Sequence, residues 1–212
     1  MRGLGIRLEV LEEWLRSRLP GNDPSHDLDH YRTGLRLAKE ISKDMPGLDW
    51  DVVASMVYLH DHLPSKKHTR SEIADLLRKS GLDESQVAKA CSGLEDRSLH
   101  IHSYLKDRKA WERAAARSTA EQKVVSDALH LELVGALGVA RLFAFSGVIG
   151  RRFVLGKEEK AGGTEDTLDR FRHRFLVGDV MLTPRGKELG KGRVRFTRRF
   201  VNRFLREWEG KA

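Results

Sequence analysis

Histidine and aspartate side chains occur in this sequence at spacings that could hold a divalent metal ion. His60 and Asp61 stand side by side at the end of the apolar run 53–59. His30 lies far upstream of this pair, and Asp127 lies in a long apolar stretch downstream. If helices bring these residues to one point, their nitrogen and oxygen atoms suit Mn²⁺, Fe²⁺, Co²⁺, Ni²⁺, Zn²⁺ or Mg²⁺. Such an ion activates a water molecule and polarises a phosphoryl oxygen, so the set is typical of a metal-dependent hydrolase.

Helices are the elements that must position these side chains. Apolar residues recur at helical spacing, and Pro20-Gly21, Pro46-Gly47 and Pro64 end the first three runs. The pattern predicts helices at 5–19, 28–45, 52–61, 73–77, 87–91, 121–145, 168–181 and 184–208. Residues 94–118 are polar without a clear period, and the Gly-rich, charged residues 146–163 favour a loop. No run has the alternation or composition of a strand, so we expect an all-α protein.

Basic residues that could bind a phosphate group lie close to the His60-Asp61 pair and in the long apolar helix. Lys66, Lys67 and Arg70 fall in a polar segment that could cover the site and bind phosphate, and a solvated loop is the competing interpretation. Arg141 lies in the apolar helix, where an arginine needs a partner, so we expect it to face the site or an ion pair. These four side chains are the predicted phosphate-binding residues.

The positive charge of the chain is concentrated in its last segment. Residues 1–150 carry 22 Lys and Arg against 22 Asp and Glu, whereas residues 151–212 carry 17 against 9 and hold the whole net charge of +8. This asymmetry indicates an anionic substrate or nucleic acid near the C-terminal part, with a solvated basic helix face as the alternative. The aromatic stripe of the last helix has core spacing and indicates packing rather than base stacking.

Length and composition favour one structural unit. A chain of 212 residues and 24.1 kDa can bury one core, which we place at 1–150, with a basic helical extension at 151–212 packed on it. The single cysteine, Cys91, allows no internal disulfide. The N-terminal residues are charged too early for a signal peptide, and no run of about 18 apolar residues predicts a membrane span. We expect a cytoplasmic protein without membrane contact, and a homodimer is left open.

Three motifs resemble those of the HD-domain metal-dependent phosphohydrolase superfamily, in particular a small bacterial and archaeal branch. The branch has HDxxHxxRV, LHD and DADRLDAxGAxGxAR, and this sequence reads HDLDHYRT at 26–33, YLHD at 58–61 and DALHLELVGALGVAR at 127–141. The segments TEDTLDRF, LTPRGKELG and FVNRFLREWEG resemble the helix-turn-helix that ends proteins of that branch. The resemblance covers residues 25–210, and GALGVAR and the Phe-rich last helix are its more specific parts.

The resemblance implies an all-α HD-domain helical bundle with a C-terminal helical extension. It also implies that His30, His60 and Asp61 bind a metal ion. Hydrolysis of a phosphoester or nucleotide phosphoanhydride is the implied reaction, and some relatives of the branch are nucleoside triphosphate pyrophosphohydrolases. We therefore expect His60 and Asp61 to be catalytic through their metal, with Asp127 or His130 completing the ligand set.

The third motif departs from the family pattern where a metal ligand is expected. Leu129 stands in place of the second aspartate, which is the ligand position in the superfamily, and His130 stands in place of the following arginine. Residues 127 and 129 point about 200° apart on a regular helix, so Asp127 is not a simple substitute, whereas His130 lies about 100° from position 129. Glu132 replaces the next family aspartate, and Thr33 replaces the arginine of the first motif. A histidine that the family carries near the end of the fifth helix is also missing around 94–95.

Two functions from different classes follow from these residues. The first is a metal-dependent phosphohydrolase that acts on a nucleotide or a related phosphate ester or anhydride. The alternative is a catalytically impaired module with the same fold that binds nucleotide or nucleic acid, which Leu129, Thr33 and the basic C-terminal segment favour.

Overall fold

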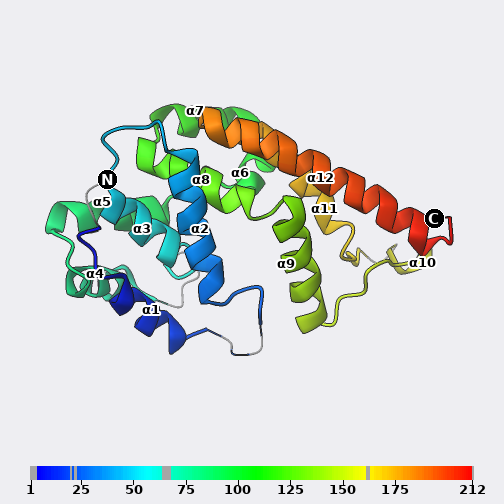
Figure 1. Cartoon of the computed structure of the whole chain (residues 1–212), viewed down its shortest axis with the longest axis horizontal. Helices are drawn as coiled ribbons and strands as arrows, with labels where there is room; N and C mark the ends of the chain where they lie inside the picture. The colour runs from blue at the N-terminus through cyan, green and yellow to red at the C-terminus, as the bar shows by residue number, and fades with distance from the viewer. Residues whose placement is uncertain (1–3, 20, 22, 64–67, 161–162, 212) are drawn as a thin grey trace.

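A computed structural model describes residues 4–19, 21, 23–63, 68–160 and 163–211. Throughout these residues the chain forms helices, turns and loops without a strand, so the all-α prediction is confirmed (Figure 1). The helices, in chain order, are α1 (Leu8–Arg16), α2 (Leu28–Ile41), α3 (Trp50–Leu59), α4 (Arg70–Lys79), α5 (Glu84–Glu95), α6 (Ile101–Lys106), α7 (Arg108–Arg117), α8 (Ala120–Leu131), α9 (Gly135–Val148), α10 (Lys157–Lys160), α11 (Arg170–Arg174), the 3₁₀ turn η1 (Val177–Asp179) and α12 (Pro184–Trp208).

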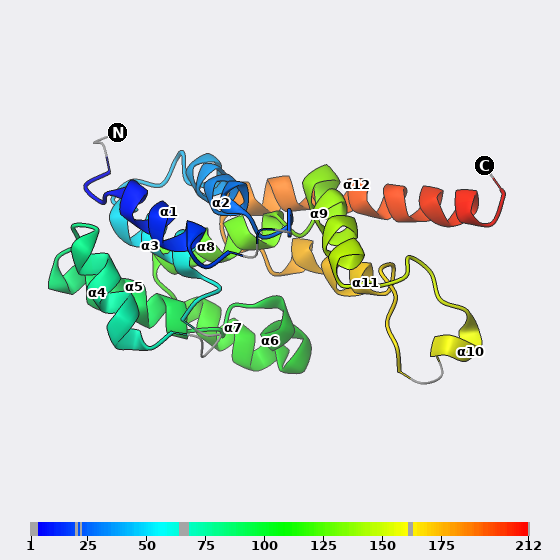
Figure 2. The same cartoon turned by 90° about the horizontal axis from the view of Figure 1, so that it is seen from below.

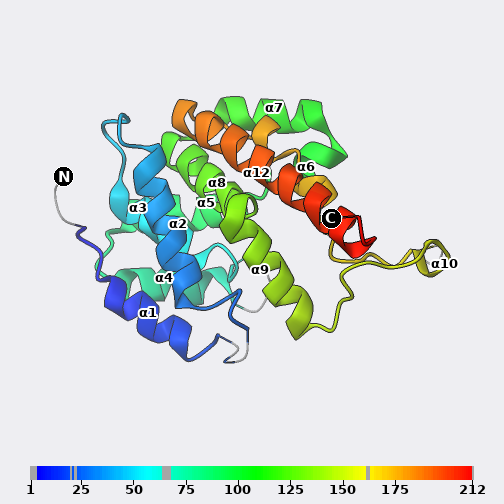
Figure 3. The same ribbon diagram turned by 45° about the vertical axis from the view of Figure 1, so that its right-hand side comes forward.

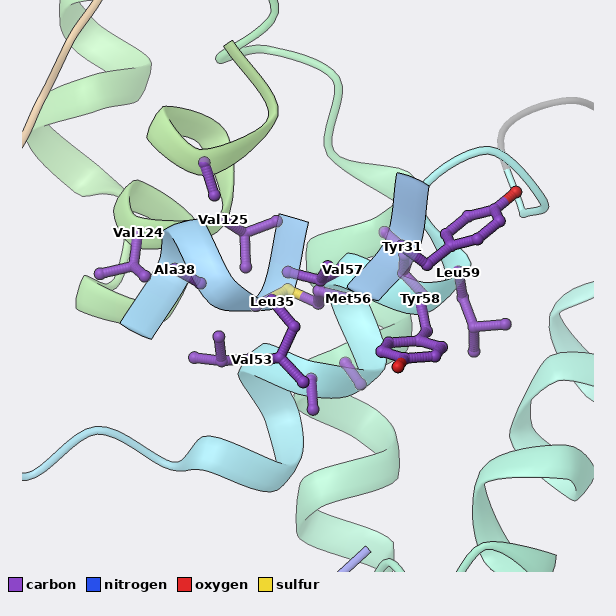
Figure 4. Packing of buried hydrophobic residues seen from close by; sticks show 14 of the residues in the cluster. Tyr31, Leu35, Ala38, Val53, Met56, Val57, Tyr58, Leu59, Val124 and Val125 are labelled. Carbon is purple, nitrogen blue, oxygen red and sulfur yellow. The ribbon is translucent and has the colours of Figure 1, made fainter. Parts of the chain in front are cut away.

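The main hydrophobic core lies between α2, α3 and α8. Figure 4 shows Leu35 and Ala38 of α2 facing Val53 and Val57 of α3, with Val124 of α8 close by. All eight residues from Val52 to Leu59, the third to the tenth position of α3, are buried, because other helices pack around it. The surrounding helices therefore fix the position of the C-terminal end of α3, where His60 follows Leu59.

Side-chain caps fix where the site-bearing helices begin. The carboxylate of Asp27 accepts a hydrogen bond from the backbone N–H of His30, and that of Asp49 accepts one from Val52. Such a cap stabilises a helix start by about 1 kcal/mol. The starts of α2 and α3 are thus set by local sequence.

The long helix predicted at 121–145 is two helices, α8 and α9, with axes 67° apart. Val134 is extended and Gly135 has a φ of 78°, a left-handed conformation that glycine adopts without strain. A side chain at Gly138 would collide with the backbone of Leu133, so this glycine allows the chain to turn back closely. Glu132, the C-cap residue of α8, lies at the start of this bend.

The last helix, α12, and the residues just before it are tied to the C-terminal half of α8. Asp127 on α8 accepts hydrogen bonds from the backbone N–H groups of Leu182 and Thr183, both at 2.8 Å, and from the Thr183 hydroxyl. Thr183 in turn caps α12. Arg193, on the next turns of α12, donates to the Leu131 carbonyl at 2.8 Å. In Figure 3, α2, α8 and α12 lie side by side, as their mutual contacts require.

Two other segments differ from the sequence-based prediction. The polar residues 94–118 contain α6 and α7, which bury mainly Ile101 and Trp111, too few residues to show a period. The helix predicted at 168–181 is interrupted and forms α11 and η1. Around α11 a second hydrophobic cluster joins α9 to the far half of α12, which extends past α9 in Figure 2. The division of the chain at residue 150 stays a prediction.

Within the part of the chain that the structure describes, no single helix is long and apolar enough to cross a membrane. The bent pair of α8 and α9 meets the length and hydropathy requirement only when its two helices are taken together.

Candidate metal centre

Three side chains from two helices converge on one point. His30 lies in the first turn of α2, His60 is the C-cap of α3, and Asp61 follows it. The Nε2 atoms of the two histidines are 3.3 Å apart. Oδ2 of Asp61 lies 3.1 Å from Nε2 of His60 and 3.8 Å from Nε2 of His30. The structure therefore brings together three of the four predicted metal ligands, which can each offer one atom to a shared ion.

The separations of these atoms suit a transition-metal ion. Ligand atoms about 2.1 Å from a metal are about 3.0 Å apart at right angles and about 3.4 Å apart in a tetrahedron. Two of the three measured distances fall in this interval, and the third is slightly longer. Two imidazole nitrogens and one carboxylate oxygen on a single face leave further positions for water and substrate. The donor set thus fits a divalent ion.

Each histidine has its second nitrogen occupied, which points Nε2 towards the shared centre. Nδ1 of His60 lies 2.9 Å from the Val57 carbonyl oxygen, an acceptor that requires the proton on Nδ1. Nδ1 of His30 lies 2.8 Å from Oε2 of Glu132. The N–H direction of His30 departs from a straight hydrogen bond, so this contact is mainly electrostatic. Partners of this kind fix the orientation of metal-binding imidazoles and increase their basicity.

Glu132 is a buried carboxylate that links the centre to Arg141. Its side chain is only 1% exposed, and its Oε2 lies 3.3 Å from Nη1 of Arg141. Arg141 also donates two hydrogen bonds to the Ser25 carbonyl, through Nε and Nη2. A buried carboxylate requires such opposite charges. The sequence predicts that Arg141 faces the site or an ion pair, and the structure shows both. Arg141 lies beside Glu132 and also lines the pocket described below.

The charges in the cluster favour the ionised form of Asp61, which binds a metal, but also the protonated form of His30, which does not. Burial tends to raise the pKa of Asp61, but the adjacent His60 and His30 lower it well below its ordinary value. Burial tends to lower the pKa of His30, but Asp61 and Glu132 raise it above 6.5. Asp61 is therefore ionised at neutral pH. A metal ion competes with a proton for Nε2 of His30.

A pocket of about 240 Å³ opens onto the three converging residues. Its apolar wall includes Met56, Leu94, Leu99, Leu129 and Leu133, and its polar wall includes His26, Arg97, His100, Gln122, Ser126 and Arg141. Leu129, which stands where the family has an aspartate, thus lines the same pocket as His60 and Asp61. The pocket joins an apolar surface to a few polar groups, the composition usual for small-molecule sites.

Two residues of this pocket escaped the sequence-based prediction. His100 caps α6 and accepts a hydrogen bond from the His102 backbone N–H at Nδ1. Burial, and then the neighbouring His130, lower the pKa of His100 to about 3, so its imidazole is neutral. Arg97 is exposed and reaches the same pocket. The histidine that the family carries near the end of its fifth helix is missing at 94–95, and a histidine of the pocket lies at position 100.

Asp127 lies away from the three converging residues, and its assignment as a metal ligand is corrected. Its two oxygens accept hydrogen bonds from Leu182 and Thr183, and its side chain is fully buried. Burial raises the pKa of Asp127 despite these hydrogen bonds. His130, the alternative ligand, has both ring nitrogens engaged, with Nδ1 donating to Ser126 and Nε2 accepting from Ile101. Both residues therefore stabilise the helix packing.

The other predicted phosphate-binding residues divide into two groups. Arg141 lines the pocket, as described above. Arg70 instead forms an ion pair with Glu95 at the start of α4 and does not line the pocket, so its predicted role is not supported by its position. Lys66 and Lys67 lie outside the described residues.

Comparisons with known proteins bear on the fold of the chain. No protein-family model matches the sequence. The chain is 27% identical over 208 residues to the protein YpgQ of Bacillus subtilis (strain 168), a match that covers 95% of this chain and 94% of YpgQ.

Solved structures resemble the chain over nearly its full length. The crystal structure of Bacillus subtilis YpgQ in complex with ADP matches with a TM-score of 0.72 and 21% identity, covering 96% of this chain and 99% of that one. An HD-superfamily hydrolase from Bacillus thuringiensis matches with a TM-score of 0.69 and 20% identity, covering 96% and 95%. A predicted HD-superfamily hydrolase from an uncultured Thermotogales bacterium matches with a TM-score of 0.55 and 20% identity, covering 95% and 92%. The resemblance inferred from the motifs is thereby confirmed at the level of the fold.

Proposed function

We propose that this chain, which has the fold of the HD-superfamily hydrolases, is a metal-dependent phosphohydrolase acting on a nucleotide or a related phosphate ester or anhydride. The observation that carries the proposal is the convergence of His30, His60 and Asp61 on one point at the floor of a pocket. A divalent ion bound there would supply an acidified water molecule and a charge that polarises a phosphoryl oxygen.

The residues of the chain prepare this site in three ways. Val57 and Glu132 hold the two imidazoles with their Nε2 atoms directed at the centre. Asp61 stays ionised and supplies the negative charge that a cation requires. Arg141 balances Glu132 and, with Arg97, places positive charge along the pocket where phosphate oxygens would lie. His60 and Asp61 are accordingly the proposed catalytic residues.

A nucleotide is the proposed substrate because the pocket offers an apolar wall beside its charged end. Met56, Leu94 and Leu129 provide surface for a base or sugar, while Arg97 and Arg141 suit phosphate groups. YpgQ, which shares the fold, was crystallised with ADP. The pocket and this relative together support nucleotide over a simple alkyl phosphate.

The test is a hydrolysis screen of nucleoside mono-, di- and triphosphates with Mn²⁺, Co²⁺, Zn²⁺ or Mg²⁺ added to the purified protein. We expect release of phosphate or pyrophosphate that EDTA abolishes and that Asp61→Asn lowers by about 10³-fold or more, as for loss of a charged metal ligand. Equal activity in the variant would place the reaction elsewhere or in a contaminant.

One observation favours the alternative, a module that binds nucleotide without hydrolysing it. Leu129 lines the pocket where the family has a carboxylate, and neither Asp127 nor His130 replaces it. Calorimetric titration with nucleotides separates the two functions. Tight binding without turnover under every metal condition would favour the binding module.

A further inference from the structure

A second, smaller cavity lies next to the metal pocket and is lined mainly by basic side chains. It has a volume of about 140 Å³ and is lined by His100, Ile101, His102, Leu133, Arg170, His173 and Arg174. Two of these residues, His100 and Leu133, also line the metal pocket, so the two spaces share a wall. We propose that this cavity is a second anion-binding site that takes a phosphate or diphosphate group.

The central residue is Arg174, a half-buried arginine without a carboxylate partner among the described residues. Its Nη1 donates to the backbone carbonyls of Leu133 and Gly138, at 3.0 and 2.8 Å. Nη2 and Nε have no acceptor in the described part of the chain, and both belong to a side chain that lines the cavity. A guanidinium with two free N–H edges and no counter-ion is suited to bind phosphate through paired hydrogen bonds.

The residues around Arg174 add positive or neutral groups. Burial, and then the nearby positive charges of Arg141 and Arg170, lower the pKa of Arg174 to about 10. His102 and His173 face each other across 5.9 Å. Arg170 pairs with the exposed carboxylate of Glu165 at 2.7 Å. Among the described residues that line the cavity there is no carboxylate to neutralise Arg174.

The unpaired N–H groups of this half-buried arginine are open to the cavity and available to a ligand. An anion bound there would supply both the opposite charge and paired hydrogen bonds. Backbone carbonyls satisfy Nη1 alone, and they also hold the side chain at the break between α8 and α9. A phosphate group in the cavity would complete the hydrogen bonds of Arg174 and reach Arg170 and the two histidines.

This inference extends the proposed phosphohydrolase function, but anion binding itself requires no metal ion. The phosphate group could belong to the molecule in the metal pocket, since His100 and Leu133 border both spaces, or it could be a separate inorganic ion. Substrates with more than one phosphate group would use the first arrangement. Inorganic phosphate or pyrophosphate bound beside the substrate would represent the second.

The first experiment titrates metal-free protein in EDTA with inorganic phosphate and with pyrophosphate, followed by calorimetry and ³¹P NMR. We expect saturable binding of one anion, weakened about tenfold or more by Arg174→Gln and less by Arg170→Gln, because charge-assisted hydrogen bonds are lost. Arg172→Gln is the matched control, because Arg172 lies on the same helix, is exposed and pairs with Asp169. Arg170→Gln keeps the test decisive if Arg174→Gln does not fold.

Absence of saturable binding by the wild-type protein would overturn the proposal, as would equal weakening by Arg170→Gln and Arg172→Gln. Metal content measured on the same preparation before EDTA is added separates this failure from failure of the proposed function. Phosphate binding without metal retention would refute only the proposed hydrolase function. Metal retention without phosphate binding would refute only the proposed second anion-binding site.

A second experiment identifies the source of the phosphate group. Mn²⁺-loaded protein with bound phosphate receives a nucleoside triphosphate analogue whose bridging oxygen is replaced by methylene. Displacement of the phosphate would show that one molecule occupies both spaces. Simultaneous binding would show that the cavity takes a separate anion.

Discussion

Nδ1 of His30 lies 2.8 Å from Oε2 of Glu132, so that the second helix of the chain is held against the C-terminal end of α8. The contact is nearly inaccessible to water, with His30 and Glu132 exposing 6% and 1% of their side chains. Glu132 also lies beside Arg141. One carboxylate therefore orients a proposed metal ligand and balances a proposed phosphate-binding residue.

Replacing this carboxylate tests its role. Glu132→Gln should weaken metal affinity about 10- to 100-fold, because the partner that orients His30 and increases its basicity loses its charge. Glu132→Asp, which keeps the charge, should recover part of the affinity. Competition with a metal-sensitive fluorescent chelator measures both. Unchanged affinity in Glu132→Gln would mean that the contact only stabilises the helix packing.

Removing proposed ligands should abolish metal retention. Purified wild-type protein should hold about one divalent ion, since one cluster of three donors is found among the residues that the structure describes. His60→Ala and Asp61→Asn should each lose it, whereas Asp29→Asn, which changes an exposed carboxylate on α2, should not. Elemental analysis after gel filtration gives the metal content. Full metal content in both ligand variants would refute the proposed centre.

Restoring the missing carboxylate tests the position of Leu129. Mn²⁺ should raise the melting temperature of the Leu129→Asp variant more than that of the wild type, if position 129 can reach the ion. Without metal, the partly buried carboxylate should destabilise the fold by roughly 1–3 kcal/mol. Leu131→Asp, in the adjacent core, should be destabilised with and without metal. Identical behaviour of the two variants would show that residue 129 is ordinary core.

The stability of the fold should rise with pH in the acidic range. Burial lowers the pKa of His130 to about 4, from 6.5, so the unfolded chain binds more protons than the native one between these values. The free energy of unfolding should therefore increase by about 3 kcal/mol from pH 4 to pH 6.5 on account of this residue.

Urea denaturation at several pH values measures this slope. His130→Gln should lower stability at pH 7.5 but flatten the dependence on pH, since Gln does not titrate. A slope that the substitution leaves unchanged would assign the acid sensitivity to other groups, of which His100 is the first candidate because burial also lowers its pKa, to about 3.

Fewer basic side chains of the C-terminal segment are available to bind a partner than its sequence indicates. Arg193 packs on Gly135 and binds the Leu131 carbonyl, so it stabilises the packing of α12. Arg195 and Arg199 are exposed and remain the residues with which to test nucleic-acid binding. If this face binds nucleic acid, Arg195→Glu and Arg199→Glu should weaken binding and reduce its dependence on salt. Filter binding at low ionic strength without any retained nucleic acid would exclude the interaction.

The elements that were predicted well depend on local signals. Asp27 and Asp49 cap α2 and α3, and Thr183-Pro184 begins α12, all within one turn of sequence. The break before α9 was missed because the apolar pattern continues across it, and only the positive φ of Gly135 shows the turn. The helix α7 was missed because Trp111 is its single buried residue.

The site could be predicted only where its chemistry is local. His60 and Asp61 are adjacent, and His30 follows a cap of its own helix. Asp127 was assigned to the metal because an aspartate on an apolar helix has the same sequence pattern whether it binds an ion or a backbone. Its true partners lie 55 and 56 positions away, beyond any local motif.

Those distant partners impose an order on the folding of the newly made chain. As the chain leaves the ribosome, α8 is complete before Leu182 and Thr183 are made, so the Asp127 carboxylate at first lacks the backbone N–H groups that it binds in the folded protein. Glu132 follows Leu131, whose carbonyl binds Arg193 of α12, so its surroundings are complete only after α12 has been made. Metal loading would then follow synthesis rather than accompany it, and a stalled chain ending before residue 182 would have both proposed metal ligands His30 and His60 without a finished centre.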